Sequence, residues 1–181
     1  MSDKVLYDNE WIQLCLKDDW YVYTHQKKSH GEGIAVLVFD SKTNNVLGRY
    51  EHTPCHGEGL RLTAITGMCD KKGLSPDEIT IEELKEEAGI IADKEELIYL
   101  GWIYPSKSSD TKLHLYAIDG GDKELGKIEG DGTRGEEGAY VKWIPISVAM
   151  TCNDSTVFSS ITKLKLKGID LLSADPFTGL I

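Results

Sequence analysis

The stretch from Thr66 to Ile90 constrains the fold of this chain more than any other part of the sequence. It opens with a glycine-bearing loop and continues into a clearly delimited helix. Ser75 can cap the helix N-terminus, Pro76 suits the first helical position, and Glu78 completes a capping box. Gly89 stands where many helices end on a left-handed residue. The pattern therefore predicts a loop and then a helix with defined ends.

Acidic side chains are concentrated on one side of this predicted helix. At about 100° per residue, Glu83, Glu86 and Glu87 fall within an arc of roughly 100°. Apolar residues lie on the opposite side, so we expect that side to pack and the acidic face to look outward; they are Ile81, Leu84 and Ala88. Carboxylates converging from a fixed helix suit a hard divalent cation such as Mg²⁺.

A solvated acidic surface is the alternative interpretation of the same helix. The close glutamate pairs should destabilise the helix by a few tenths of a kcal/mol each, about 1–2 kcal/mol in all. A domain with roughly 5–15 kcal/mol of stability can carry that without a metal. The helix alone therefore leaves both interpretations open.

Length and charge limit the classes of partner. The chain has 181 residues, enough for one sizeable domain with a small appendage. Its net charge of −10 argues against binding nucleic acid or anionic membranes, but a bound metal can still attract a phosphorylated ligand. No apolar run approaches the roughly 20 residues of a membrane span, and the N-terminus lacks the regions of a secretory signal. The four cysteines are scattered, which favours reduced thiols and a cytoplasmic location.

Two smaller groups of residues are candidates for binding. Arginine is scarce, so each arginine is a candidate for phosphate contact; they are Arg49, Arg61 and Arg134. His52, Cys55 and His56 form one compact group, but a second pair of ligands that would complete a tetrahedral zinc site is missing from the sequence. We therefore interpret that group as a structural or substrate-lining turn rather than a zinc site.

The rest of the chain is predominantly strand. Residues 11–24 indicate two strands joined around Asp18 and Asp19, and a hairpin of this size must pack on the main domain or on a second subunit. Further strands and a final helix starting near Asp154 or Ser155 are expected; the strands are 34–39, 46–51, 60–66, 97–104, 112–118 and 140–145. The glycine-rich segment 120–138 is long enough for a functional loop.

Segment 82–90 reads Glu-Glu-Leu-Lys-Glu-Glu-Ala-Gly-Ile. With the glycine loop and capped helix before it, this run resembles the signature of the Nudix hydrolases, which ends in Arg-Glu-apolar-x-Glu-Glu-x-Gly-apolar. The resemblance implies an α/β (α+β) fold, a mixed β-sheet sandwiched between helices with a small N-terminal β-hairpin appendage. It divides the chain into an appendage of residues 1–28 and a Nudix hydrolase domain of residues 29–181.

The chain departs from the family pattern in two places. The loop from Gly67 is one residue longer than usual, which places Leu74 where an acidic residue is common; its Gly-Leu-Ser-Pro ending is similar to the subgroup that hydrolyses ADP-ribose and nucleoside-diphosphate sugars. Glu82 stands at the position of the family's arginine. We expect Glu82 to lie at the flank of the acidic face, paired with Lys85, while a cation from elsewhere replaces the arginine. This departure bears on turnover more than on metal binding.

The resemblance also implies a mechanism and a set of site residues. Water attacks a diphosphate with the help of Mg²⁺, for which Mn²⁺ can substitute. The implied metal ligands are Glu83, Glu86, Glu87 and the backbone carbonyl of Thr66, and Glu86 is also counted among the catalytic residues.

A glutamate in the loop before the last strand orients or deprotonates the water in the resembling subgroup. Glu137 is the best match for that residue and Glu136 is second. Their alternative role is that of solvated loop carboxylates. The subgroup further implies a homodimer whose N-terminal appendage contributes to the base-binding site.

Three hypotheses follow from these observations. The first is a Mg²⁺-dependent pyrophosphohydrolase acting on a small nucleoside-diphosphate substrate such as ADP-ribose or a nucleotide sugar. The second is a Nudix-fold module that binds such a nucleotide with little or no hydrolysis, as Glu82 would favour. The third is an unrelated protein with an ordinary acidic helix.

Overall fold

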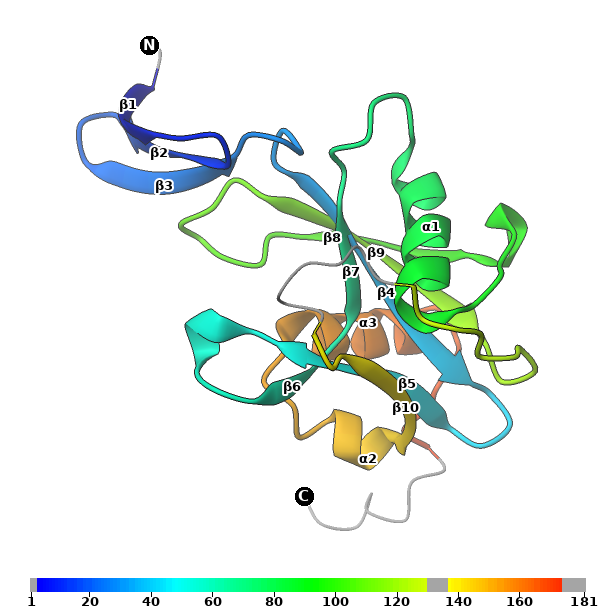
Figure 1. The fold of residues 1–181 in the computed structure, drawn as a ribbon. Coiled ribbons are helices and arrows are strands. Elements are labelled where there is room, and N and C mark those ends of the chain that lie inside the picture. Colours follow the sequence, from blue (N-terminus) through cyan, green and yellow to red (C-terminus); the bar gives the residue numbers. More distant parts are fainter. Residues whose placement is uncertain (1–2, 130–136, 174–181) are drawn as a thin grey trace.

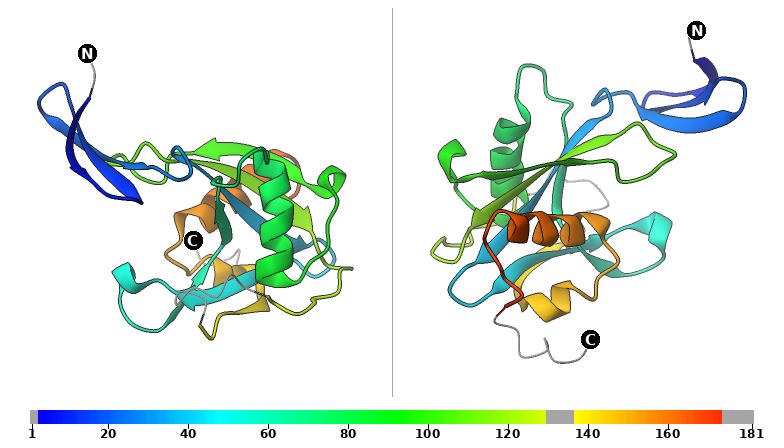
Figure 2. Two further views of the ribbon diagram at one scale, coloured as in Figure 1. Left: turned by 45° about the horizontal axis from the view of Figure 1, so that its top comes forward. Right: turned by 180° about the vertical axis from the view of Figure 1, so that it is seen from behind.

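The computed structural model describes residues 3–129 and 137–173. Its main body is a mixed β-sheet with helix α1 on one face and helices α2 and α3 on the other (Figures 1 and 2). The strands are β1 (Lys4–Asp8), β2 (Ile12–Lys17), β3 (Tyr21–Gln26), β4 (Glu32–Asp40), β5 (Asn45–His52), β6 (Leu60–Thr63), β7 (Ile65–Met68), β8 (Ile98–Ile103), β9 (Lys112–Asp119) and β10 (Tyr140–Pro145). The helices are α1 (Pro76–Ala88), α2 (Ile146–Ala149) and α3 (Ser155–Leu166), with short 3₁₀ turns η1 (Pro54–His56) and η2 (Lys94–Glu96). The predicted fold class, a mixed sheet between helices, is confirmed.

Strand order in the main sheet is β10-β5-β4-β9-β8, with β6 added to β5 and β7 added to β4. β4 and β9 run parallel from the pair Glu32–Lys112 to the pair Phe39–Asp119, whereas the other pairings between the strands named above are antiparallel. The centre of the sheet is thus a parallel pair, which needs a long crossover connection. Helix α1 lies within that connection and covers one face.

Strand β4 is buried on both faces, as its continuous apolar run predicts. Alternate side chains enter two separate clusters. Ile34, Val36 and Val38 pack in the cluster that includes Leu84 and Ala88 of α1. Ala35, Leu37 and Phe39 pack in the cluster that includes Val157, Ile161 and Leu164 of α3. One set of alternate β4 side chains therefore packs against α1, together with Leu47, Ile65 and Ile118 of neighbouring strands.

The prediction of one strand over residues 60–66 is wrong, because the structure divides this segment in two. β6 pairs with β5, and β7 pairs with β4. At the junction, the backbone N–H of Ala64 donates to Asp154 Oδ2 at 3.1 Å instead of joining a ladder. Asp154 lies just before α3, so a contact distant in sequence sets the break, and the local apolar alternation carries no sign of it.

The N-terminal appendage has three strands, in the order β1-β2-β3. The predicted hairpin corresponds to β2 and β3, with Asp18 and Asp19 in left-handed conformation at the turn (φ 50° and 61°). β1 adds to β2 and was not predicted, because all five of its residues are exposed and give no burial pattern. The predicted boundary after residue 28 falls between the end of β3 and the start of β4.

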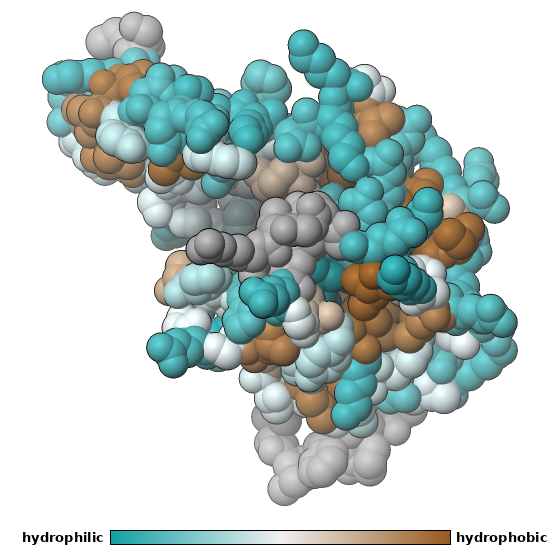
Figure 3. Space-filling view, viewed as in Figure 1, coloured by the Kyte–Doolittle hydropathy of each residue, from teal (hydrophilic) through white to brown (hydrophobic). Residues whose placement is uncertain are grey.

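Figure 3 shows hydrophobic side chains gathered on this appendage, which stands away from the main sheet in Figure 1. Its large exposed apolar residues are Val5, Leu6, Tyr7, Trp11, Trp20 and Val22. Within the part of the chain that the structure describes, no helix has the length and apolar character needed to cross a membrane.

Candidate active site

The N-terminal turn of helix α1 forms as the sequence predicts. Glu78 Oε2 accepts from the backbone N–H of Ser75 at 2.7 Å and from the Ser75 hydroxyl at 2.6 Å, within a capping box. Asp77 in the same turn pairs with Lys94 of η2 at 2.5 Å. The hydrogen bond and charge of Lys94 lower the pKa of the Asp77 carboxyl below its ordinary value. These contacts fix where the helix starts.

The C-terminal turn of α1 is held by partners from three directions. Gly89 is left-handed (φ 65°), and its N–H donates to the carbonyl of Lys85 at 3.0 Å. The carbonyl of Glu86 accepts from the backbone N–H of Glu129 at 3.1 Å. The carbonyl of Glu87 accepts from Arg49 Nη1 at 3.1 Å. Carbonyls that a helix end leaves unsatisfied are therefore tied to the following loop and to strand β5.

The predicted acidic face exists, and Glu83 lies at its edge nearest to β7. The Glu83 carboxylate rests against Gly67, where an added Cβ would meet Oε1 at 2.3 Å. Only a glycine permits this approach, so the backbone just after Thr66 and the Glu83 carboxylate are neighbours. Glu86 is half-buried on the same helix face. The surface over α1 is mostly hydrophilic (Figure 3).

Glu87 is buried, with 7% of its surface exposed, so the prediction that the whole acidic face looks outward is wrong for this residue. The reason is Arg49 on β5, which is 1% exposed and places Nη2 3.1 Å from Glu87 Oε1. Arg49 also donates from Nε to Glu51 Oε2 at 2.8 Å. A buried carboxylate and a buried guanidinium each require such a partner.

Arg49 was predicted only as one of three phosphate candidates, and its role toward the helix was missed. A signal for it exists in the sequence: the arginine lies inside the predicted strand 46–51, which begins with the apolar residues Val46 and Leu47. An arginine inside such a strand implies a buried carboxylate partner. The partner lies 38 residues away, so strand periodicity alone does not identify it.

Glu82 pairs with Lys71 and not with Lys85. Lys71, in the loop between β7 and α1, places Nζ 2.7 Å from Glu82 Oε2 and 3.6 Å from Glu86 Oε1. The hydrogen bond that Lys71 donates to Glu82 raises the pKa of the Lys71 ammonium, so it stays charged. The loop between β7 and α1 thus brings a cation to the flank of the acidic face.

Packing of α1 also differs in detail from the prediction. Leu84 and Ala88 are fully buried as expected. Ile79, rather than the predicted Ile81, is the third apolar residue of α1 that is buried, and Ile81 is only half-buried. Ile79 precedes Leu84 by five positions and joins the same cluster as Ile34 and Val36. The helix is therefore turned slightly from the predicted orientation, which carries Glu87 toward the sheet and Arg49.

The remaining predicted residues lie elsewhere. Glu137 is exposed in the turn before β10, and Glu136 lies outside the described residues. Their assignment to the water-activating role stays a prediction. His52, Cys55 and His56 are exposed around η1, where the His56 carbonyl accepts from Arg61. Arg134 also lies outside the described residues.

Among residues 3–129 and 137–173, no three His, Cys, Asp or Glu side chains are gathered closely enough to form a ready-made metal site. The donor set nevertheless fits a hard cation, since it consists of carboxylates beside a glycine backbone that leaves room for them. In this structure Arg49 and Lys71 supply the positive charge next to Glu87 and Glu86.

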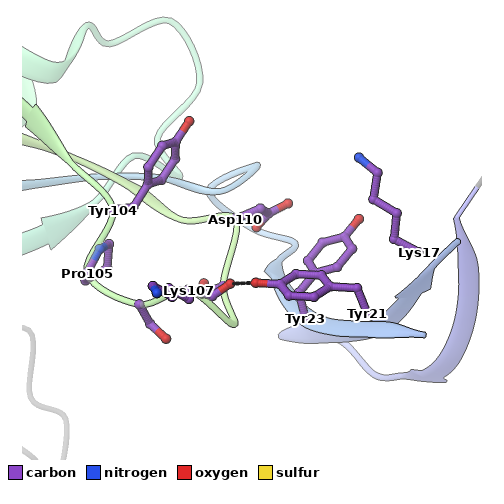
Figure 4. Close-up of a pocket in the computed structure, with 9 residues that line it drawn as sticks. Lys17, Tyr21, Tyr23, Tyr104, Pro105, Lys107 and Asp110 are labelled. Carbon is purple, nitrogen blue, oxygen red and sulfur yellow. Dashed lines mark hydrogen bonds between the residues drawn. The ribbon is translucent and has the colours of Figure 1, made fainter.

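A cavity of about 580 Å³ lies apart from the acidic face. Figure 4 shows its lining: Tyr21, Tyr23 and Lys17 come from the appendage, while Tyr104 and Lys107 come from the β8–β9 side. The Tyr21 hydroxyl donates to the Lys107 carbonyl across it.

The protein is thus an α+β sandwich in which a mixed sheet lies between helices, and the helix on one face, α1, carries the candidate carboxylates. The fold is similar to that in a crystal structure of an ADP compounds hydrolase, with a TM-score of 0.66 and 18% sequence identity. The match covers 93% of this chain and 94% of that chain. No protein-family model matches the sequence, and no curated protein matches it. At 18% identity the likeness establishes a shared fold.

Proposed function

We propose that this chain is a Mg²⁺-dependent Nudix pyrophosphohydrolase that cleaves the diphosphate bond of ADP-ribose or of a nucleoside-diphosphate sugar. The observation that carries the proposal is the acidic face of α1, where Glu83 rests against Gly67 and Glu87 is anchored to the sheet by Arg49. The fold shared with an ADP compounds hydrolase supports it.

In this mechanism Glu83, Glu86, Glu87 and the Thr66 carbonyl would hold the cation. When bound, Mg²⁺ polarises phosphoryl oxygens and stabilises the charge that develops as water attacks. The chain's own residues supply orientation: α1 is fixed at both ends, so its carboxylates are held in place before substrate arrives.

Two further residues take part in the proposed reaction. Lys71 lies where it can meet a phosphate that approaches the acidic face. Glu137, or Glu136 in its place, accepts the proton of the attacking water. Water attack then divides the diphosphate into two phosphate products, of which one is a nucleoside monophosphate.

A substrate panel tests the proposal. Purified protein with Mg²⁺ or Mn²⁺ is expected to release AMP from ADP-ribose or UMP from a UDP-sugar, measured by chromatography. Glu86→Gln should lower kcat by more than about 100-fold, because it removes a cation ligand without leaving a deeply buried charge unpaired. Glu95→Gln, an exposed acid on η2, is the matched control and should keep full activity. Undiminished turnover in Glu86→Gln would show that the metal-site assignment is wrong.

A nucleotide-binding module with little or no hydrolysis is the second candidate. It is favoured by Glu82 at the position of the family's arginine and by the ion pairs of Arg49 and Lys71 with the carboxylates. Measurable binding of ADP-ribose by calorimetry, with no monophosphate released from any diphosphate in the panel, would decide for this candidate.

We also propose a homodimer in the cytoplasm. The exposed apolar side chains of the appendage supply the surface for a second copy. The net charge of −10 supports a small-molecule substrate over nucleic acid.

A further inference from the structure

At 1% exposure, Arg49 is the most deeply buried charged side chain among the described residues. Each of its three guanidinium nitrogens has a partner. Nε donates to Glu51 Oε2 at 2.8 Å, Nη1 donates to the Glu87 carbonyl at 3.1 Å, and Nη2 lies 3.1 Å from Glu87 Oε1. The guanidinium plane is therefore fixed on two sides.

Two of these contacts go to the same residue, and this sets Arg49 apart from an ordinary ion pair. Nη1 donates to the backbone carbonyl of Glu87, and Nη2 forms an ion pair with the carboxylate of the same residue. Because the guanidinium group is planar and rigid, contacts with both the carbonyl and the carboxylate of Glu87 restrict the side-chain torsions of Glu87. A lysine ammonium on a flexible stem cannot reproduce that geometry.

The strands hold Arg49 in turn. Its partner Glu51 accepts from Thr63 Oγ1 of β6 at 3.4 Å, and Arg49 itself pairs with Val141 of β10 and Thr63 of β6 in the sheet. The chain of contacts runs from the sheet through Arg49 to one carboxylate of the acidic face.

We propose that Arg49 is a positioning residue that orients the Glu87 carboxylate for cation binding. It does so from strand β5, while Glu82 on the helix is turned to Lys71 and takes no part. This inference rests on the proposed function, because it requires that the acidic face binds a divalent cation. The competing explanation is structural, namely that Arg49 only caps the helix end and neutralises buried acids.

Two variants separate these explanations because both preserve the net charge of the cluster. Arg49→Lys keeps the positive charge and loses the planar guanidinium. Arg49→Met combined with Glu51→Gln removes one positive and one negative charge, and it leaves Glu87 without a guanidinium partner. The second variant leaves the buried Glu87 carboxylate unpaired, so Arg49→Lys, which keeps a positive charge beside that carboxylate, is the variant expected to fold.

Mn²⁺ is the probe, titrated into substrate-free protein and followed by electron paramagnetic resonance of the free ion. We expect about tenfold or greater weakening of Mn²⁺ affinity in both variants, the range seen when a residue that orients a ligand is removed. Kinetically, kcat should fall while KM for the diphosphate stays near its original value. Lys94→Gln, which breaks the ion pair at the other end of α1, is the control and should bind Mn²⁺ as the parent does.

The outcomes are distinguishable. If the parent protein binds Mn²⁺ and folded variants bind it equally well, Arg49 is a structural cap and the inference is overturned. If the parent protein itself fails to bind Mn²⁺, with or without AMP, the metal site of the proposed function fails and the inference falls with it.

Discussion

At the scale of single residues, Arg49 and Lys71 partly neutralise the glutamates of α1. The spacing of the glutamates in the sequence predicts the acidic face but not these two cations. Helical periodicity predicts that Glu83, Glu86 and Glu87 share a helix face, because residues three and four apart are neighbours on a helix, but Glu87 is buried against Arg49. The cations were not predictable in the same way. Arg49 reaches Glu87 from a strand, and Lys71 reaches Glu82 from a loop, so both depend on tertiary structure.

Lys71 offers a test at this scale. Its Nζ lies near Glu86, and its side chain is 45% exposed, so it can leave Glu82 for a phosphate. We expect Lys71→Gln to raise KM for the diphosphate about fivefold to tenfold with little change in kcat, because a charged hydrogen bond to the bound ground state is lost. Steady-state kinetics measure this, with Lys72→Gln as the neighbouring control. A fall in kcat at constant KM would instead give Lys71 a role in the transition state.

At the scale of secondary-structure elements, the helices and strands were easier to predict than the tertiary contacts between them. Helix α1 follows from local chemistry at both ends, and β4 follows from its apolar run. β1 and the break between β6 and β7 do not, because exposure hides the first and a distant aspartate sets the second. The buried position of Glu87 is equally hard to predict, since its partner Arg49 lies on a strand that is distant in the sequence.

Gly89 shows what fixes the end of α1. Its φ of 65° is left-handed, and an added Cβ would meet the backbone of Gly126 at 2.5 Å. Gly89→Ala should therefore lower the free energy of unfolding by more than about 2 kcal/mol, from a conformational term of about 1–2 kcal/mol plus displacement of the 120–129 loop. Gly168→Ala, after α3, has φ 92° and open space around it, so it should show the conformational term alone. Equal losses in urea unfolding would mean that the loop contact contributes nothing.

At the scale of the whole molecule, strand β3 of the appendage contacts the segment between β8 and β9 of the main domain. Thr24 N–H donates to the Ser108 carbonyl at 2.9 Å, and Asp110 N–H donates to the Thr24 carbonyl at 3.1 Å. His25 Nδ1 lies 2.8 Å from Asp110 Oδ2 beside them. This joint leaves apolar side chains of β1 to β3 exposed, and a three-stranded sheet with exposed apolar residues on it is poorly stable without a partner surface.

The proposed dimer supplies that surface, and two appendage residues test it. Leu6 and Val22 are 46% and 42% exposed, so Leu6→Asp with Val22→Asp places charge on the surface without emptying a core. We expect the parent protein to run as a dimer by light scattering and this variant as a monomer, because charges in an apolar interface lose their hydration. Ile91→Asp is the matched control, since Ile91 is 70% exposed on the main domain, and it should leave the dimer intact. Mn²⁺ affinity should be unchanged in both, because the acidic face lies on α1. A variant that stays dimeric would exclude this face of the appendage as the interface.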